Sequence, residues 1–403
     1  MKKHLSELAI FGGTPTFTEK LHVGRPNIGS KQILLQRIND ILDSKWLSNN
    51  GPTVQEFEQQ VASLIGAKHC IATCNATTGL EIAIKACKLK GEVIIPSFTF
   101  VATAHALQWQ GIEPIFCDVD PLTHNIDTQK IEALITDKTT AIMGVHLWGR
   151  GCDVEALEEI ARRYNLKLLF DAAHAFGCSY KGQMIGNFGD AEVFSFNATK
   201  FCNSFEGGAI VTNDSELAKK IRLMKNFGFS EIDRVDELGI NGKMNEVSAA
   251  MGLTSLESIE DFISTNHKNY KQYQQELSNL TGINLINYDD TERCNYQYVI
   301  IEIDESIAGI SRDKLYQILW AENILARRYF YPGCHQMEPY RSRIADMGLM
   351  LTNTRHLAAR VLALPTGTAI GTREISNICQ ILRLAITGGN ITNGTLYEYA
   401  CAS

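Results

Sequence analysis

The segment Phe194-Ser-Phe-Asn-Ala-Thr-Lys200-Phe-Cys-Asn-Ser-Phe-Glu206-Gly-Gly-Ala-Ile-Val-Thr212 places one lysine in a polar turn between two apolar runs. The runs predict strands at residues 191–196 and 208–212, and a glycine pair ends the turn between them. Burial lowers the pKa of a lysine, because desolvation disfavours the ammonium form. A neutral amine forms a Schiff base with an aldehyde, so Lys200 is a candidate catalytic residue. Taken by itself, a lysine in a turn is more often a surface residue.

Short β-rich runs alternate with amphipathic stretches on the N-terminal side of this segment. The expected strands are residues 70–73, 92–95, 114–117, 141–145 and 166–170. The expected helices include residues 78–87, 99–110 and 154–164. This alternation predicts an α/β fold with a mostly parallel sheet covered by helices on both faces. Ligands of such folds bind at the carboxyl ends of the strands.

The length of 403 residues predicts a large domain and a smaller second domain. Residues 244–277 read as one long helix that links the two. The smaller, α+β part is expected to hold a strand at residues 296–303 and helices at residues 312–321 and 372–385. We therefore divide the chain into an N-terminal arm (1–51), a large cofactor-binding domain (52–255), a small C-terminal domain (256–388) and a loose tail (389–403). The arm shows few periodic segments, so we expect it to wrap the surface or a neighbouring subunit.

Composition excludes several classes of partner. The formal net charge of −7 argues against nucleic acid and anionic membranes as partners. No run approaches the roughly 20 apolar residues that span a bilayer, and the N-terminus lacks the features of a secretory signal. The 11 cysteines lack paired spacing, so we expect reduced thiols in a cytoplasmic protein without a metal site. Disulfides and metal ligation are the alternatives.

A carboxylate ends the apolar run of residues 166–170, in Leu168-Leu-Phe-Asp171-Ala-Ala-His174. At the carboxyl end of a strand, Asp171 would face a bound ligand. Pyridoxal phosphate needs such an anion to keep its pyridine nitrogen protonated, and the two alanines would let a flat ring approach. The competing interpretation is that Asp171 caps a following helix.

Two further segments suit the other parts of this cofactor. In Ile71-Ala-Thr-Cys-Asn75-Ala-Thr77-Thr78 a strand leads into a helix, whose first N–H groups and hydroxyls would bind a phosphate. Plain helix capping by Asn75 or Thr77 explains the same residues. Phe100 follows the next strand, where it would either stack on the cofactor ring or pack in the core.

Together with Trp46-Leu-Ser-Asn-Asn-Gly-Pro52, Glu206-Gly-Gly208 and Asn241-Gly-Lys-Met244, these segments resemble the DegT–DnrJ–StrS family of sugar aminotransferases. The motifs occur in the same order, and the resemblance runs from about residue 25 to about residue 384. It implies the three-layer αβα fold of type I pyridoxal-phosphate transferases, with pyridoxal 5′-phosphate as the cofactor.

The resemblance also implies roles for single residues around the cofactor ring. Lys200 would hold the cofactor covalently and then move a proton to or from the substrate carbon. Asp171 would pair with the pyridine nitrogen, His174 would lie near the phenolic oxygen, and Phe100 would stack on the ring.

The remaining implied contacts concern the phosphate and the substrate. Ala76, Thr77 and Ser195 would hold the phosphate, and Lys243 would reach it from the partner subunit of a homodimer with shared active sites. In Arg327-Arg-Tyr-Phe-Tyr-Pro-Gly-Cys-His335, Tyr331 and His335 would face the sugar. Read alone, Lys243 is a solvated turn residue and His335 a loop histidine with its hydrogen bonds satisfied.

The implied reaction is transamination of a nucleotide-linked keto-sugar. Relatives that dehydrate their substrate carry histidine in place of Lys200. The segment His146-Leu-Trp-Gly-Arg-Gly-Cys-Asp153 is most similar to the branch that aminates dTDP-4-dehydro-6-deoxy-D-glucose at carbon 4, with L-glutamate as donor. The alternatives are amination at carbon 3, a GDP- or UDP-linked sugar, and a non-catalytic regulatory protein of the same fold.

Overall fold

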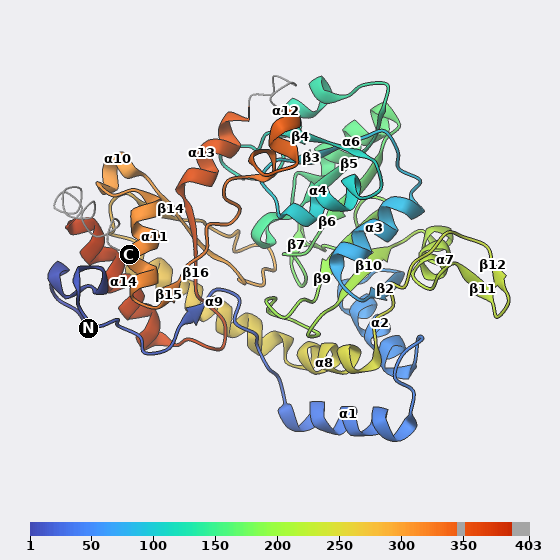
Figure 1. Cartoon of the computed structure of the whole chain (residues 1–403), viewed down its shortest axis with the longest axis horizontal. Coiled ribbons are helices and arrows are strands. Elements are labelled where there is room, and N and C mark those ends of the chain that lie inside the picture. The colour runs from blue at the N-terminus through green and yellow to red at the C-terminus, as the bar shows by residue number, and fades with distance from the viewer. Residues whose placement is uncertain (345–350, 389–403) are drawn as a thin grey trace.

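The computed structural model describes residues 1–344 and 351–388, and a seven-stranded sheet forms its centre (Figure 1). The strand order is β2-β10-β9-β6-β5-β3-β4. β10 runs antiparallel to both of its neighbours, and all other pairs are parallel. The strands are β2 (His69–Thr73), β3 (Glu92–Pro96), β4 (Glu113–Cys117), β5 (Thr139–Val145), β6 (Lys167–Asp171), β9 (Ala191–Ser195) and β10 (Gly208–Thr212). The predicted α/β fold with a mostly parallel sheet is confirmed.

Helices cover both faces of this sheet, because successive strand residues point to opposite sides and both sides are apolar. In β3, Val93 and Ile95 pack toward one face and Ile94 toward the other. The first face carries α3 (Ala76–Ala86), α4 (Val101–Gln108) and α7 (Ser215–Met224). The second face carries α2 (Pro52–Ile65), α6 (Val154–Tyr164) and α8 (Glu246–Glu257). This is the expected three-layer αβα arrangement.

Local sequence signals set the ends of these helices. The side chain of Asp153 accepts a hydrogen bond from the N–H of Ala156 at the start of α6, and Asn165 ends the helix in the left-handed conformation at φ 53°. Between the two, Leu157 and Ile160 share the buried face, as helical spacing requires.

A second, three-stranded antiparallel sheet lies in the C-terminal part, in the order β13-β14-β16. Its strands are β13 (Ile283–Leu285), β14 (Val299–Ile303) and β16 (Val361–Leu364). The accompanying helices are α10 (Glu305–Ala308), α11 (Arg312–Ala321), α12 (Tyr340–Ile344), α13 (Thr352–Arg360) and α14 (Thr372–Thr387). The smaller α+β part is therefore present, while the predicted domain boundaries stay a prediction. The predicted tail at residues 389–403 lies outside the described residues.

The single long helix expected at residues 244–277 is wrong. Two helices, α8 and α9 (Ile259–Leu277), meet at Ser258, whose φ of −106° and ψ of 10° interrupt the helix. α8 is buried along most of its length against α2 and α1, whereas α9 packs with α14 and β13 of the C-terminal part. The helix is interrupted at the point where the chain stops packing against α2 and α1 and begins to pack against the C-terminal part. Serine at position 258 does not by itself predict the end of a helix.

The N-terminal arm contains a helix that we did not expect, α1 (Lys31–Ser44), which lies beside α8 at the edge of the molecule (Figure 1). Ser30 caps this helix, and Leu34 and Ile41 pack against α8. Before it, β1 (Leu21–His22) pairs in parallel with β15 (Ile324–Leu325), so the arm contacts the C-terminal part of the same chain.

The remaining elements are short. They are α5 (Thr128–Ile131), β7 (Ser179–Tyr180), β8 (Gln183–Met184), β11 (Phe229–Glu231) and β12 (Arg234–Val235), and five 3₁₀ turns at Leu5–Glu7, Ala9–Phe11, Glu132–Leu134, Leu147–Gly149 and Cys334–Gln336. Among residues 1–344 and 351–388, no helix combines the length and the apolarity needed to cross a membrane.

Candidate active site

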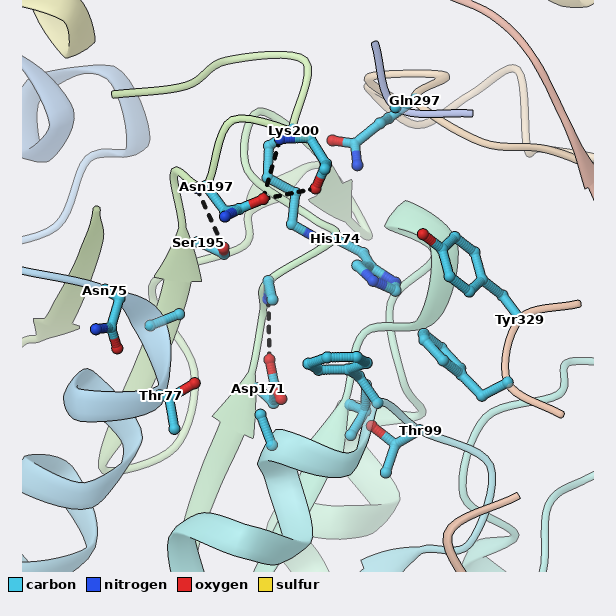
Figure 2. Close-up of a pocket in the computed structure, with 18 of the residues that line it drawn as sticks. Asn75, Thr77, Thr99, Asp171, His174, Ser195, Asn197, Lys200, Gln297 and Tyr329 are labelled. Atoms are coloured by element: carbon cyan, nitrogen blue, oxygen red, sulfur yellow. Dashed lines mark hydrogen bonds between the residues drawn. The ribbon is translucent and has the colours of Figure 1, made fainter. Parts of the chain in front are cut away.

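A cavity of about 350 Å³ opens at the carboxyl ends of the parallel strands. Segments that follow β2, β3, β6 and β9 form most of its wall, and residues 297–298 and 327–330 of the C-terminal part close it from the opposite side. Val23 and Gly24 of the arm complete the lining. Figure 2 shows Asn75 and Thr77 on one side, His174 and Tyr329 on the other, Asp171 below and Lys200 above.

Lys200 lies in the turn after β9 and lines this cavity. The turn is closed by its own backbone, since the N–H of Lys200 donates to the carbonyl of Asn197 at 2.8 Å. The amine lies 3.2 Å from the hydroxyl oxygen of Tyr298. Burial lowers the pKa of Lys200 to about 8, against the opposing attraction of the Asp171 carboxylate. The amine is thus neutral in a substantial fraction of molecules near physiological pH.

Asp171 ends β6 with its side chain buried beneath the cavity. One carboxylate oxygen accepts a hydrogen bond from the Thr103 hydroxyl at 2.7 Å, and the other accepts from the N–H of Ala173 at 3.1 Å. Burial raises the pKa of Asp171, while these two hydrogen bonds and the Lys200 charge act in the opposite direction. Residues 172–178 form turns, so the competing interpretation of Asp171 as a helix cap is wrong.

His174 lies on the cavity wall with its protonation fixed by a backbone contact. Its Nδ1 accepts a hydrogen bond from the N–H of Trp148 at 3.3 Å, which leaves Nε2 to carry the proton of the neutral ring. Burial and the charge of Lys200 hold the pKa of His174 well below its ordinary value. The ring stacks on Phe330 at a centroid distance of 5.7 Å, so His174 presents a neutral N–H donor to a ligand.

The start of α3 forms an anion-binding cradle. Asn75 caps the helix by accepting from the N–H of Thr78 at 2.8 Å, and the N–H groups of Ala76 and Thr77 have no acceptor within the described part of the chain. Ala76, Thr77 and Ser195 all line the cavity. Gly208 lets β10 lie against this cradle, because a Cβ at that position would come within 2.6 Å of the Ala76 nitrogen. Asn75 therefore caps the helix at Thr78, and the N–H groups of Ala76 and Thr77 are still available to bind an anion.

Phe100 precedes α4, is 55% exposed and lies on the cavity wall. Its ring centroid lies 6.1 Å from that of Phe330. This exposure shows that Phe100 is not a core aromatic, and its position suits stacking on a flat ligand.

Three of the predicted site residues are not on the cavity wall of the single chain. The amine of Lys243 donates to the Asn226 side chain at 2.9 Å and lies 4.6 Å from the centre of the Phe227 ring. The predicted role of Lys243 involves a partner subunit and stays a prediction.

Tyr331 and His335 also lie away from the cavity. Tyr331 is exposed between the guanidinium groups of Arg312 and Arg328, at 4.9 and 4.7 Å from its ring centre. His335 is only 1% exposed, and its two ring nitrogens have no hydrogen-bond partner within the described residues. Burial lowers its pKa to about 4. The competing interpretation of His335 as a loop histidine with satisfied hydrogen bonds is therefore wrong, while the predicted contacts of Tyr331 and His335 with the sugar stay a prediction. The turn that holds these residues contributes Tyr329 and Phe330 to the cavity instead.

Sequence reasoning missed several residues that the structure brings to the site. They include Thr103, which supports Asp171, and the cavity residues Asn197, Glu206, Gln297, Tyr298, Arg327, Tyr329 and Phe330. Thr103 lies one helical turn after Phe100, and that spacing is a signal we did not use. Gln297 and Tyr298 belong to residues 296–303, which the sequence predicts as an ordinary strand, so their pattern did not indicate a place on the cavity wall.

Comparison with known proteins extends the likeness over nearly the whole chain. A model of the DegT/DnrJ/EryC1/StrS aminotransferase family matches residues 29–383. The dTDP-4-amino-4,6-dideoxy-D-glucose transaminase of Shigella dysenteriae is 38% identical over 365 residues, which cover 90% of this chain and 98% of that protein. The GDP-perosamine synthase of Caulobacter vibrioides is 36% identical over 312 residues, 76% of this chain and 84% of that protein. The solved structure of DesI in the presence of its TDP-sugar product is 49% identical, with a TM-score of 0.92, and the match covers 96% of this chain and 98% of that one. The chain belongs to the DegT/DnrJ/EryC1/StrS aminotransferase family.

Proposed function

We propose that the chain uses pyridoxal 5′-phosphate to move an amino group from L-glutamate to carbon 4 of dTDP-4-dehydro-6-deoxy-D-glucose, which yields a dTDP-4-amino-4,6-dideoxy sugar. The observation that carries this proposal is the joint presence of Lys200 and Asp171 on one cavity, together with a helix N-terminus suited to phosphate. The substrate rests on the likeness to the Shigella transaminase and to DesI.

The size and the lining of the cavity also suit pyridoxal phosphate. Its volume of about 350 Å³ leaves room for a flat heterocycle and part of a substrate. The N–H groups of Ala76 and Thr77 and the Ser195 hydroxyl would hold the phosphate, and Phe100 would cover one ring face. When bound, pyridoxal phosphate supplies an aldehyde for an amine and a ring that accepts electrons from the reacting carbon.

The residues of the chain then have separate tasks. Asp171 would keep the ring nitrogen protonated, because its buried carboxylate accepts only two hydrogen bonds from the described residues. The Nε2–H of His174 would donate a hydrogen bond to the phenolic oxygen. Lys200, with a pKa of about 8, would bind the aldehyde and would carry a proton to or from the reacting carbon.

The acceptor sugar would enter from the side formed by the C-terminal part. Tyr329 and Phe330 offer aromatic surface there, and Arg327 places an exposed guanidinium on the same wall. A guanidinium suits the diphosphate of a nucleotide sugar or the carboxylate of glutamate. The likeness to GDP-perosamine synthase favours a GDP-linked keto-sugar as the second candidate substrate.

We also propose a homodimer in which each subunit completes the other's site. Large apolar side chains are exposed near Lys243 in sequence, among them Phe227 and Phe229, and others on the arm, including Trp46 and Leu47. A second copy of the chain would remove this apolar surface from water and bring Lys243 toward the neighbouring phosphate cradle.

We place the reaction in the cytoplasm. The cysteines within residues 1–344 and 351–388 are all free thiols, as proteins of reducing compartments keep them.

The test is to incubate purified protein with cofactor, glutamate and a set of dTDP-, GDP- and UDP-linked keto-sugars. The expected product is the dTDP-linked 4-amino sugar, identified by mass and by nuclear magnetic resonance, which also separates carbon 4 from carbon 3. Lys200→Ala should abolish turnover, and Lys181→Ala should not, because Lys181 forms a surface ion pair with Glu155.

Borohydride treatment of the loaded protein should attach the cofactor to the peptide that contains Lys200. Turnover of amino donor at the normal rate by Lys200→Ala would exclude the mechanism. Failure of the protein to bind pyridoxal phosphate at all would favour the non-catalytic regulatory alternative.

A further inference from the structure

A buried tyrosine contacts the candidate catalytic amine. Tyr298 directly precedes β14, is 6% exposed and lines the same cavity as Lys200. Its hydroxyl oxygen accepts a hydrogen bond from the Lys200 amine at 3.2 Å. The two residues are 98 positions apart in the sequence, so this contact exists only because the C-terminal sheet packs against the turn after β9.

The backbone on both sides of this contact is anchored. The side-chain oxygen of Gln297 accepts a hydrogen bond from the N–H of Phe201 at 3.2 Å, which ties the neighbour of Tyr298 to the neighbour of Lys200. The hydroxyl of Tyr288 donates to the carbonyl of Tyr298 at 2.7 Å. The position of the phenol relative to the lysine turn is therefore set by two hydrogen bonds between side chains and the main chain, one on each side of the contact.

The ring of Tyr298 is also held in place. It packs against His174 at a centroid distance of 4.5 Å and against Tyr329 at 6.4 Å. Burial raises its pKa well above the ordinary value, so the phenol stays protonated. Such a hydroxyl accepts a hydrogen bond from an ammonium and donates one to the lone pair of a neutral amine.

We propose that Tyr298 is a positioning residue for Lys200, whose phenol holds the free amine against the C-terminal wall of the cavity whenever that amine is not bonded to the cofactor. A lysine side chain has four rotatable bonds, and an amine released into the cavity without a partner would populate many positions. The hydrogen bond to Tyr298 restricts those positions and keeps the amine at the cavity. This inference rests on the proposed function.

The other charged or titratable groups that surround the amine come from several segments. Asp171 and His174 follow β6, Glu206 lies in the turn before β10, and Arg327 and Tyr329 lie on the C-terminal wall. The Asp171 carboxylate stabilises the charged form of the Lys200 amine, whereas burial destabilises that form. The bond to the ammonium is charge-assisted and therefore stronger than the bond to the neutral amine, so loss of the Tyr298 hydroxyl should lower the pKa of Lys200 further.

The experiment measures the protonation of Lys200 directly in full-length protein freed of cofactor. Trace acetic anhydride acetylates only neutral amines, and the acetylated peptide with Lys200 is quantified by mass spectrometry from about pH 6 to about pH 11. The midpoint should lie at about 8 in the unmodified protein. In Tyr298→Phe it should fall by about one pKa unit, a roughly tenfold change in the protonation equilibrium.

Tyr329→Phe is the matched control, because it removes a phenol from the same wall while leaving the Tyr298 contact intact. Its midpoint should equal that of the unmodified protein. In the loaded enzyme, Tyr298→Phe should lower kcat about tenfold with little change in the KM for glutamate. The thermal melting of both variants checks that they are folded.

An unchanged midpoint in Tyr298→Phe, or an equal shift in Tyr329→Phe, would overturn the inference. The labelling uses neither substrate nor cofactor, so its outcome is separate from that of the proposed function. An active aminotransferase with a normal midpoint in Tyr298→Phe would disprove the role of Tyr298 alone, whereas an inactive protein with a shifted midpoint would leave the contact established and the proposed function disproved.

Discussion

At the scale of single residues, the chemistry available at the site depends on how far the pKa of each ionisable group departs from its value in water. Lys200 and Asp171 are buried at the same cavity. The charge of each residue partly offsets the effect of burial on the pKa of the other. Neither residue is unusual in sequence, and only the apolar strands before them indicated burial. The sequence therefore predicted two groups that line the cavity, but not the hydroxyl groups of Thr103 and Tyr298 that bond to them, since these partners come from segments 68 and 98 positions away.

Removal of the Thr103 hydroxyl should weaken cofactor binding. Thr103→Val keeps the shape of the side chain but leaves Asp171 without its 2.7 Å hydrogen bond. A hydrogen bond to a charged group contributes about 1.5–3 kcal/mol, so the Kd for pyridoxal phosphate should rise at least about tenfold. Fluorescence titration measures this Kd, and Thr103→Ser, which keeps the hydroxyl, should bind nearly normally. Equal affinity in both variants would show that Asp171 does not need this support.

Capture of the cofactor should depend on pH through Lys200. Its pKa is lowered to about 8, so the neutral, reactive fraction increases as pH rises toward and through that value. The rate at which cofactor-free protein binds pyridoxal phosphate should rise with pH and level off above about 8, whereas an ordinary lysine would still gain reactivity up to about 10.4. Stopped-flow absorbance measures the rate. A plateau near the ordinary value would contradict the burial of this amine.

At the scale of helices and strands, periodicity predicted the sheet and its covering helices well, because apolar residues at period 2 and near period 3.6 reflect burial directly. The break at Ser258 was not predicted, because it is decided by which neighbouring element each helix meets, and local sequence does not encode that choice. α1 was missed although Ser30 and the spacing of Leu34 and Ile41 indicate a capped amphipathic helix.

The contact between β10 and the start of α3 requires glycine at position 208. In Gly208→Ala the new Cβ would lie 2.6 Å from the backbone of Ala76, so the strand or the helix must shift. Overpacking of this kind costs about 1–3 kcal/mol, and the shift would also displace the N–H groups that we propose bind the phosphate. We expect a lower melting temperature and weaker binding of inorganic phosphate, measured by calorimetry.

Gly371→Ala is the comparison, because its new Cβ would meet nothing closer than 3.4 Å, from the flexible Glu374 side chain. A normal phosphate affinity in Gly208→Ala would mean that the start of α3 is not the phosphate site.

At the scale of the whole molecule, a buried carboxylate joins the central sheet to the C-terminal part. Asp118 follows β4 and accepts hydrogen bonds from the N–H groups of Asn353 and Thr354 at 3.1 and 2.8 Å, which caps α13 from a distance of 235 positions or more. It also accepts from the Thr354 hydroxyl and from Lys130. These contacts lower its pKa against the effect of burial.

Asp118→Asn should therefore destabilise the protein in a pH-dependent way. A carboxylate whose folded pKa is lowered stabilises the fold above its unfolded pKa near 3.8 and loses that contribution as pH falls through the folded value. The variant should lose about 1.5–3 kcal/mol near neutral pH, and the difference should shrink as pH falls below 3.8 through the lowered pKa of Asp118. Urea unfolding across this range measures it, and a difference that does not vary with pH would argue against the carboxylate as the cause.

The arm and the C-terminal part meet at the lysine turn. Asn27 donates to the carbonyl of Phe201 at 3.0 Å and accepts from the N–H of Thr368 at the same distance. On the ribosome, Lys200 emerges long before Tyr298 or Thr368 exists, so the nascent chain carries this amine uncovered for much of translation. If the proposed function holds, retention of pyridoxal phosphate would thus require the finished polypeptide, and a truncated product that ends before β14 would carry Lys200 without its Tyr298 partner, open to reaction with cellular aldehydes.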